Sequence, residues 1–288
     1  MSGVLLMASQ IGGAIAPLLV LPIQARYGWR ASFFVFGAMG VLWAMAWFAW
    51  FRDSPGEKAG VSEAELRETA NQPRAPAHGF PWRVALRSET VVATMCLALC
   101  YVYVYTFFQT WFHTFLVRGR GFTEGNLMLS ALPYALAACA NVTGGAASDA
   151  LVRRLGPKWG RRSLGFVGLG TACLCTIAVM LTRQPVMTVV LLSLVYAGIT
   201  FQQPGVFGVC LDVGRQHAGS IVGLMNTSAQ VGGLIGSLAY GYIVERFGSY
   251  DAPFVPMATL LFIGAVLWLK VDASAEVGVE ALEVARTV

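Results

Sequence analysis

Residues 163–182 read SLGFVGLGTACLCTIAVMLT, residues 184–211 read QPVMTVVLLSLVYAGITFQQPGVFGVCL, and only Arg183 stands between them. Neither stretch contains an Asp, Glu, Lys or Arg residue. As an α-helix, each is long enough to cross the hydrocarbon core of a bilayer, which is roughly 30 Å thick and takes about 20 residues. The pair therefore predicts two successive transmembrane helices that are joined by a very short turn.

Six more charge-free stretches of similar length occur along the chain. They are residues 1–25, 31–51, 90–117, 125–148, 216–244 and 252–269. Helices are expected in all eight stretches, because a strand exposed to lipid would leave its backbone groups unpaired. The sequence therefore predicts an all-α integral membrane protein with eight transmembrane helices.

The overall composition supports a membrane protein and excludes several other classes. Hydrophobic residues make up 56% of the chain and charged residues 12%, with a mean hydropathy of +0.63. A typical soluble domain is about 45–50% apolar and about 25% charged. These values argue against a soluble domain, a disordered chain and a nucleic-acid-binding protein. The six cysteines lie in uncharged stretches and form no C-x-x-C pair, so the sequence predicts no disulfide framework, no metal site and no cofactor.

The distribution of lysine and arginine predicts the orientation in the bilayer. Between the charge-free stretches, 14 of these residues fall on one side and 6 on the other. The richer side is expected to be cytoplasmic, and both termini are then cytoplasmic. The first stretch has no basic segment before its apolar residues, so we expect no cleaved signal peptide and a chain that begins at or inside a transmembrane helix.

One long polar stretch divides the chain. Residues 52–89 contain four prolines and charges of both signs. We therefore predict two helices in residues 1–51, a cytoplasmic linker in residues 52–89, a six-helix bundle in residues 90–271 and a cytoplasmic tail in residues 272–288.

No Asp, Glu, Lys or Arg lies in the middle of any charge-free stretch. Any binding site at that depth must therefore use polar uncharged side chains. Amides cost free energy in lipid, so they should face protein or a watery cavity. The alternative is that their hydrogen bonds only hold the helices together. Tyr101, Tyr105 and Gln109 stand at i, i+4 and i+8, so they share one face of a helix. The residues that we predict to line a cavity are Gln10, Tyr101, Tyr105, Gln109, Gln203 and Asn226.

Two further features bear on function and packing. His113 lies near the outer end of the third stretch, where a membrane acyltransferase could use it as a general base. No orienting carboxylate is visible nearby in the sequence, so the simpler interpretation is an interfacial histidine, and no catalytic residue is predicted. The G-x-x-x-G pairs Gly219/Gly223 and Gly232/Gly236 are typical of closely packed helices.

One charged segment resembles a known family signature. Residues 144–154 read GGAASDALVRR and residues 160–162 read GRR. They resemble the G-x-x-x-D-x-x-x-R-x-G-R-R signature of the major facilitator superfamily, which lies in a cytoplasmic loop between helices. The resemblance implies a charge network that forms in one conformer and breaks in another, and the alternative is plain cytoplasmic anchoring. The residues of this gating loop are Asp149, Arg153, Arg154 and Arg161.

Other segments extend the resemblance over nearly the whole chain. Residues 27–30 (YGWR), 130–134 (SALPY) and 210–213 (CLDV) are similar to helix junctions of the anion:cation symporter branch, whose members include sugar-acid and other organic-anion carriers. Three residues depart from that branch. His113 stands where proline is usual, Phe207 where tryptophan is common, and Gln230 where a second asparagine is common.

The resemblance implies that the eight helices match helices 5–12 of a twelve-helix fold, in which two six-helix bundles enclose the site. The chain would then be N-terminally truncated. By the same resemblance, the proton-coupling carboxylates and an anion-binding arginine belong to helices 1–4.

These observations predict secondary active transport of a small organic anion, a carboxylate or sugar acid, coupled to protons in the complete protein. The membrane is expected to be a bacterial inner membrane, and residues 1–288 alone are expected to be inactive. Two alternatives remain at this point: a membrane-embedded acyltransferase-like enzyme that uses His113, and a truncated membrane protein without function. The sequence does not predict an oligomeric state or the direction of transport.

Overall fold

The computed structural model describes residues 2–52, 60, 62, 80–122 and 131–275. Most of the predicted linker and most of the predicted tail lie outside these residues. The chain forms two compact units: Met1–Ile11 with His78–Val288, and Gly12–Ala77. The second unit holds the rest of helix α1 (Ser2–Tyr27) and helix α2 (Trp29–Trp50), which follow each other through Gly28.

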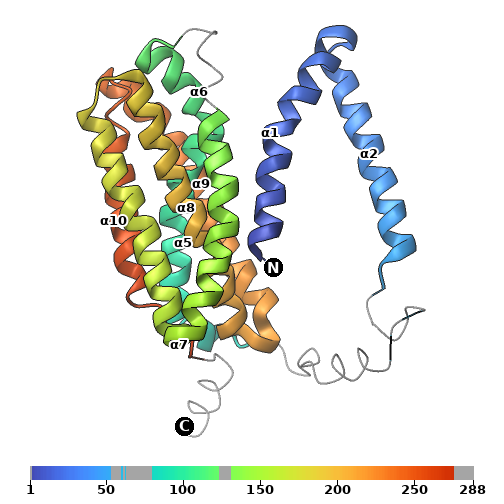
Figure 1. Ribbon diagram of the computed structural model, residues 1–288, viewed down its shortest axis with the longest axis vertical. Helices are drawn as coiled ribbons and strands as arrows, with labels where there is room; N and C mark the ends of the chain where they lie inside the picture. Colours follow the sequence, from blue (N-terminus) through green and yellow to red (C-terminus); the bar gives the residue numbers. More distant parts are fainter. Residues whose placement is uncertain (1, 53–59, 61, 63–79, 123–130, 276–288) are drawn as a thin grey trace, which may run out of the picture. The chain divides into compact units, whose positions relative to one another are not determined.

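Every regular element in the described residues is helical, which confirms the predicted all-α membrane class. The first unit contains a bundle of long helices that run side by side (Figure 1). After α1 its elements are α4 (Trp82–Ala85), α5 (Glu89–Thr110), α6 (Phe112–Thr114), the π-helical turn η2 (Phe115–Gly119), α7 (Leu132–Leu181), α8 (Pro185–Gly214), the 3-10 turn η4 (Arg215–His217), α9 (Ala218–Phe247) and α10 (Phe254–Trp268).

Several of these helices are long and apolar enough to cross a membrane. Trp29–Trp50 and Glu89–Thr110 each have 22 residues, which suffices for one crossing. Leu132–Leu181 has 50 residues and the continuous helical stretch Pro185–Phe247 has 63, so each is long enough for two. Phe254–Trp268 is a shorter apolar helix of 15 residues.

Helix α7 contains most of the fourth and fifth charge-free stretches and reverses direction between them. Its backbone leaves the helical region at Gly156, where φ is 77° and ψ is 169°. A positive φ is accessible to glycine without steric cost, and Pro157 is well placed to start the next helix. After the turn, Gly160 packs so closely that a Cβ there would lie 2.7 Å from the backbone nitrogen of Val152.

This geometry corrects the expectation that residues 149–162 form a loop. The helix continues past the charged residues as far as Gly156, and helical structure resumes at Pro157. Charged side chains end the apolar stretch, but they do not end the helix, because lysine and arginine are good helix formers once the chain reaches water.

The two G-x-x-x-G pairs behave differently. At Gly232 an added Cβ would clash with the backbone of Leu99, and at Gly236 it would lie 2.6 Å from a second carbonyl oxygen of α5. This pair therefore lets α9 cross α5 at close range, as the motif predicts. Gly219 and Gly223 meet nothing within 4 Å in the described part of the chain, so their motif has no packing role there.

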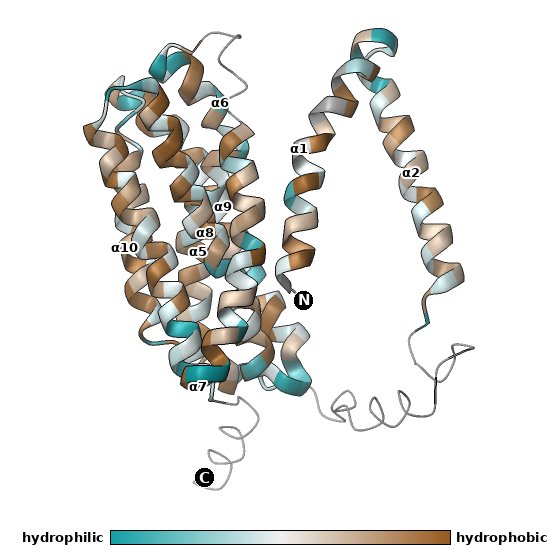
Figure 2. Ribbon diagram, in the orientation of Figure 1, coloured by the Kyte–Doolittle hydropathy of each residue, from teal (hydrophilic) through white to brown (hydrophobic). Residues whose placement is uncertain are grey.

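Aromatic side chains fill the core of the bundle. Phe107 and Phe108 of α5 are buried, and Phe108 stacks on Tyr196 of α8 with ring centroids 4.4 Å apart. Trp268 of α10 is fully buried and donates a hydrogen bond from its indole nitrogen to Gln202 of α8. Hydrophilic residues concentrate toward the ends of the helices and apolar residues between them (Figure 2).

At one end of the bundle an ion-pair cluster joins three connections. Arg120, which follows η2, contacts both carboxylate oxygens of Asp251 at 2.6 and 3.2 Å. Arg183, between α7 and α8, contacts the same carboxylate at 3.3 Å. The Arg120 side chain is only 5% exposed, so the bidentate geometry offsets the cost of burying its charge.

The opposite end holds a second set of ion pairs. Lys158 contacts Asp272 at 2.5 Å, and Arg161 contacts Asp212 at 3.1 Å. Lys270 contacts Glu89 at 3.4 Å, between two exposed side chains. These pairs place the turn of α7, the end of α8 and the residues after α10 at one end of the bundle.

Candidate functional site

A cavity of about 350 Å³ lies in the first unit, between the first turns of α1 and helices α5, α8 and α9. All six residues singled out as candidate cavity residues line it: Gln10, Tyr101, Tyr105, Gln109, Gln203 and Asn226. The other residues that line it are Leu6, Ser9, Val102, Thr106, Phe207, Met225, Ala229 and Gln230. The convergence is a structural observation, and binding by these side chains stays a prediction.

Helical spacing explains how the cavity is assembled. Tyr101, Tyr105 and Gln109 lie one turn apart on α5, so one face of that helix supplies three polar groups. Asn226 and Gln230 are i and i+4 on α9. The close crossing of α5 and α9 at the glycines brings the two faces together.

The amides and phenols on one side of the cavity form a hydrogen-bonded cluster. The Nε2 group of Gln10 donates to the hydroxyl of Tyr105 at 3.2 Å. The Nε2 group of Gln109 donates to the same hydroxyl at 3.0 Å and to that of Tyr196 at 3.3 Å. Tyr196 in turn donates to Oε1 of Gln10 at 3.3 Å. We call Gln10, Tyr105, Gln109 and Tyr196 the amide–phenol cluster.

Three further residues belong to this region and are not among the six predicted cavity residues, although Phe207 and Gln230 were noted as departures from the family pattern that bear on the cavity lining. Tyr196 lies in an apolar stretch, and although Ser193 and Thr200 stand near it at helical spacing, the sequence does not single it out. Phe207 stands one turn after Gln203, and Gln230 one turn after Asn226. That i, i+4 spacing was sufficient to place both residues on the cavity face.

Adjacent glutamines on α8 have opposite surroundings. Gln203 lines the cavity, whereas Gln202 is fully buried and accepts a hydrogen bond at 3.2 Å from the indole of Trp268. Successive residues on a helix point about 100° apart, so only one of the two can face the cavity.

The cavity is polar but uncharged. No Asp, Glu, Lys, Arg or His is among the described residues that line it. Its hydrogen-bonding groups are amides, phenols and hydroxyls, which can donate to an anion and accept from a hydroxylated substrate. Because none of these groups carries a charge, burying them costs much less free energy than burying an arginine or a carboxylate.

The proposed gating residues are arranged differently from the expectation. Within the described residues, Asp149 forms no ion pair with Arg153 or Arg154, and all three side chains are exposed. Arg161 is partly buried, and it bridges Ser148 and Asp212, with both its Nε and Nη2 groups on the Asp212 carboxylate. Asp212 is therefore the acidic partner of Arg161, and the sequence motif did not identify it.

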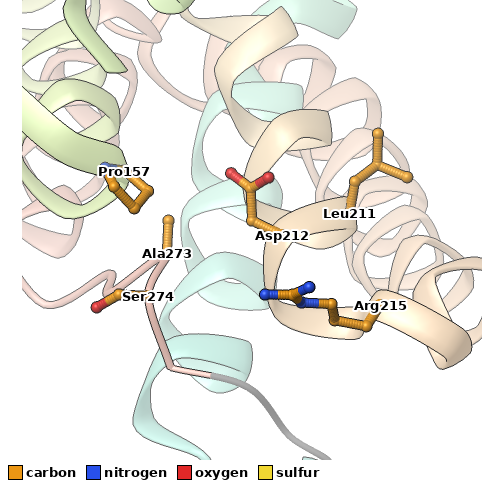
Figure 3. A pocket seen from close by; sticks show the side chains of 6 residues that line it. All are labelled: Pro157, Leu211, Asp212, Arg215, Ala273 and Ser274. Atoms are coloured by element: carbon orange, nitrogen blue, oxygen red, sulfur yellow. The ribbon is translucent and has the colours of Figure 1, made fainter. Parts of the chain in front are cut away.

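A second hollow, of about 450 Å³, opens beside this ion pair. Figure 3 shows its lining residues, which come from the turn of α7, the end of α8 and the segment after α10: Pro157, Leu211, Asp212, Arg215, Ala273 and Ser274. Arg215 has a φ of 45°, a conformation that costs free energy for a residue with a side chain. The strained backbone marks the junction where α8 passes into α9.

His113 does not lie in a catalytic arrangement. It belongs to the short helix α6, its side chain is exposed, and no described carboxylate contacts it. The described residues also contain no cluster of three or more His, Cys, Asp and Glu side chains that could hold a metal ion.

Comparison with known proteins identifies the family of this chain. The Major Facilitator Superfamily model matches residues 1–237, and the chain therefore belongs to this superfamily. Its relatives include the probable sulfoacetate transporter SauU of Cupriavidus necator, which is 32% identical over 92% of this chain and 62% of its own length.

Two further relatives also have names of anion carriers. The hexuronate transporter of Bacillus subtilis is 26% identical over 95% of this chain and 67% of its own length. The chloroplastic sodium-dependent phosphate transport protein 1 of Arabidopsis thaliana is 27% identical over 91% of this chain and 51% of its own length. The chain thus spans about one half to two thirds of the relatives that it matches.

Membership of the superfamily confirms two predictions. The protein is a multi-pass integral membrane protein, because its helices are apolar and long enough to cross the bilayer and the family is a family of membrane transporters. The family and these relatives are transporters rather than enzymes, which excludes the acyltransferase alternative.

Proposed function

We propose that the protein takes part in secondary active transport of a small organic anion and that the cavity is the binding site. The observation that carries the proposal is the convergence of Gln10, Tyr101, Tyr105, Gln109, Gln203 and Asn226 on one uncharged cavity. Relatives named for sulfoacetate and hexuronate support an anionic substrate, and we favour a carboxylate or sugar acid.

The cavity has the size and chemistry for such a substrate. Binding sites for small molecules typically enclose about 300–1,000 Å³, and this one encloses about 350 Å³. Amide and phenol donors can stabilise a carboxylate in place of water. Their carbonyl and hydroxyl oxygens can also accept hydrogen bonds from the hydroxyls of a sugar acid.

The charged end of the bundle suits a conformational role. In alternating access, one helix bundle moves against another around a central site. The end that carries Asp149, Arg153, Arg154 and Arg161 lies away from the cavity, so we propose that it acts on this movement as a gate. We place this end and both termini in the cytoplasm, and we place the protein in the cell membrane of a bacterium.

We propose that protons drive the transport. The described cavity has no carboxylate to carry a proton, so coupling would depend on groups other than those that line it. Sodium is the competing coupling ion, because one relative is named as a sodium-dependent phosphate transporter.

Uptake into proteoliposomes tests the proposal. Vesicles containing the 288-residue chain are supplied with labelled glucuronate or sulfoacetate, under a proton gradient, a sodium gradient or neither. Residues 1–288 by themselves are expected to accumulate neither anion, whereas a complete transporter that contains them is expected to accumulate the anion only with the proton gradient and to stop with a protonophore. Accumulation by the complete transporter that follows only the sodium gradient would contradict proton coupling, and gradient-driven accumulation by residues 1–288 alone would contradict the expectation that they are inactive.

A further inference from the structure

Tyr196 lies behind the cavity and does not line it. The residue is fully buried, and its ring is held by three aromatic neighbours from α5 and α7. Phe108 stacks on the ring at 4.4 Å, and Tyr134 meets it edge-on at 5.6 Å. With the ring fixed in this way, the Tyr196 hydroxyl occupies one position relative to the cavity wall.

The hydroxyl of Tyr196 determines how the side-chain amide of Gln10 is oriented. A tyrosine hydroxyl has one hydrogen, and Tyr196 donates it to Oε1 of Gln10. The Gln10 oxygen is therefore turned toward Tyr196, and the Gln10 NH₂ group is turned toward Tyr105, to which it donates. A flipped amide would place an NH₂ group against the Tyr196 hydrogen and an oxygen beside Tyr105, and both contacts would be weaker.

One amide hydrogen of Gln10 is not used within the cluster. Gln10 donates only one of its two amide hydrogens to a described residue, the hydroxyl of Tyr105. The Tyr105 hydroxyl also accepts from Gln109 and interacts with the hydroxyl of Tyr196. Gln10 lines the cavity, so its second amide hydrogen belongs to the cavity wall.

We propose that Tyr196 is a positioning residue for anion binding: it fixes the Gln10 amide so that Gln10 offers a hydrogen-bond donor, and not an acceptor, to the substrate. This inference rests on the proposed function and adds a reason for selectivity. The cluster joins α1 to α5 and α8, so one buried phenol sets the hydrogen-bonding polarity of a wall built from three helices.

Loss of the Tyr196 hydroxyl should affect the binding of charged and of neutral ligands differently. Without the Tyr196 hydroxyl, the Gln10 amide can flip and present its oxygen to the cavity. An amide oxygen repels a carboxylate but can still accept a hydrogen bond from a neutral ligand. Removal of the hydroxyl should therefore weaken anion binding selectively, whereas a packing defect would weaken binding of charged and neutral ligands alike.

The test is the binding of glucuronate and of its neutral counterpart glucuronamide to the purified chain, measured by calorimetry. Tyr196→Phe removes the hydroxyl and keeps the ring. It should weaken glucuronate binding about tenfold or more, the effect of one hydrogen bond to a charged group, and change glucuronamide binding by less than about twofold. In a Gln10→Leu background the same substitution should have no further effect on glucuronate.

Tyr134→Phe is the matched control. Tyr134 packs on the same ring and donates to the backbone oxygen of Phe108, but it does not line the cavity. This substitution should leave the affinity for glucuronate unchanged. An equal loss in the Tyr134 and Tyr196 variants, or an equal loss for the two ligands, would overturn the positioning role.

A second measurement does not depend on any ligand. In protein labelled with ¹³C at the tyrosine ζ carbon, Gln10→Leu should shift the signals of Tyr105 and Tyr196 and leave that of Tyr134 in place. Unshifted signals of Tyr105 and Tyr196 would show that the amide–phenol cluster does not form. If the cluster is present but the wild-type chain binds neither glucuronate nor sulfoacetate, the proposed function fails for these anions, and the role of Tyr196 in binding them fails with it.

Discussion

The cavity differs in charge from the end of the bundle that contains the turn of α7 at Gly156, which we call the α7-turn end. The cavity is lined by amides, phenols and apolar groups, with no charged side chain among its described residues. The α7-turn end contains Arg161, Asp212, Lys158 and Asp272 in direct ion pairs. Both regions are polar, but only the second contains charges.

We attribute the difference to the depth that each region is expected to have in the bilayer. A charge at the centre of the hydrocarbon costs several kcal/mol unless it is paired or hydrated, whereas a helix end reaches the headgroups and water. Neutral dipoles can therefore form a binding surface where charges are costly, and ion pairs can form and break where water is near. We therefore propose recognition by the cavity and conformational control at the α7-turn end.

The largest expected effect is on the helix crossing that forms the cavity. Gly232→Ala would place a Cβ against the backbone of Leu99, so α5 and α9 must separate. We expect a loss of about 3 kcal/mol or more in the free energy of unfolding, together with weaker anion binding. Gly223→Ala, which meets nothing within 4 Å, should cost less than about 0.5 kcal/mol. Similar unfolding temperatures for the two variants in detergent would show that the crossing is not tight.

A charge placed in the cavity tests why the cavity is neutral. Asn226→Asp would add a carboxylate to the wall that faces the anion. Repulsion at a separation of about 7 Å should weaken anion binding by about 2 kcal/mol, or about thirtyfold, at neutral pH. Binding should recover as the pH falls and the new carboxyl becomes protonated. Asn226→Ala should weaken binding less and without this dependence on pH. Unchanged affinity in the Asp variant would mean that Asn226 does not face the substrate.

At the α7-turn end, loss of a charge should affect movement more than binding. Asp212→Asn leaves Arg161 without its acidic partner, so the conformer in which the pair forms loses stability. In the complete transporter we expect turnover to change about fivefold, equivalent to about 1 kcal/mol, while the affinity for the anion stays within about twofold. Asp149→Asn is the control, because Asp149 is exposed and forms no ion pair with a described residue. A larger effect of Asp149→Asn than of Asp212→Asn on turnover would support the gating role that the sequence motif predicts for Asp149.

The smallest expected effect concerns Asp272. Partial burial favours its neutral form, but the Lys158 ammonium and hydrogen bonds from Ser274 outweigh burial and hold the pKa of the carboxyl below its usual value. A lowered pKa in the folded state adds stability above the ordinary pKa of about 4, and that stability is lost as the pH falls through the lowered value.

Asp272→Asn should therefore reduce the free energy of unfolding by less than about 1 kcal/mol at pH 7, because Lys158 is partly exposed. The difference from wild type should shrink below about pH 4. A difference that persists at low pH would show that packing, and not the ion pair, is responsible. Thermal unfolding in detergent between pH 3 and 7 measures it.

Sequence reasoning predicted the class of fold and the cavity residues for definite physical reasons. The bilayer requires long apolar helices, and a helix repeats every 3.6 residues, so polar positions such as Tyr101 and Tyr105 had to share a face. Residues on different helices, such as Gln10 and Asn226, were grouped because buried amides need polar surroundings.

The features that sequence reasoning missed depend on contacts between distant segments. Tyr196 reaches Gln10 across 186 positions of the chain, and nothing local to Tyr196 indicates this. Asp212 became the partner of Arg161 only because the turn at Gly156 brings the second half of α7 beside α8. Charged residues mark only the end of an apolar stretch and not the end of a helix, so the sequence pattern does not predict the helical structure of residues 149–155.

The central claim is that an uncharged, amide-lined cavity binds a small organic anion. Calorimetric titration of the purified chain with glucuronate and sulfoacetate, in wild type and in Gln203→Ala, tests it most directly, because Gln203 lines the cavity and lies outside the amide–phenol cluster. We predict saturable binding of at least one anion to the wild type and an affinity at least about fivefold lower in the variant, the effect of one lost hydrogen bond. Equal affinity in the two proteins would contradict the assignment of this cavity as the anion site.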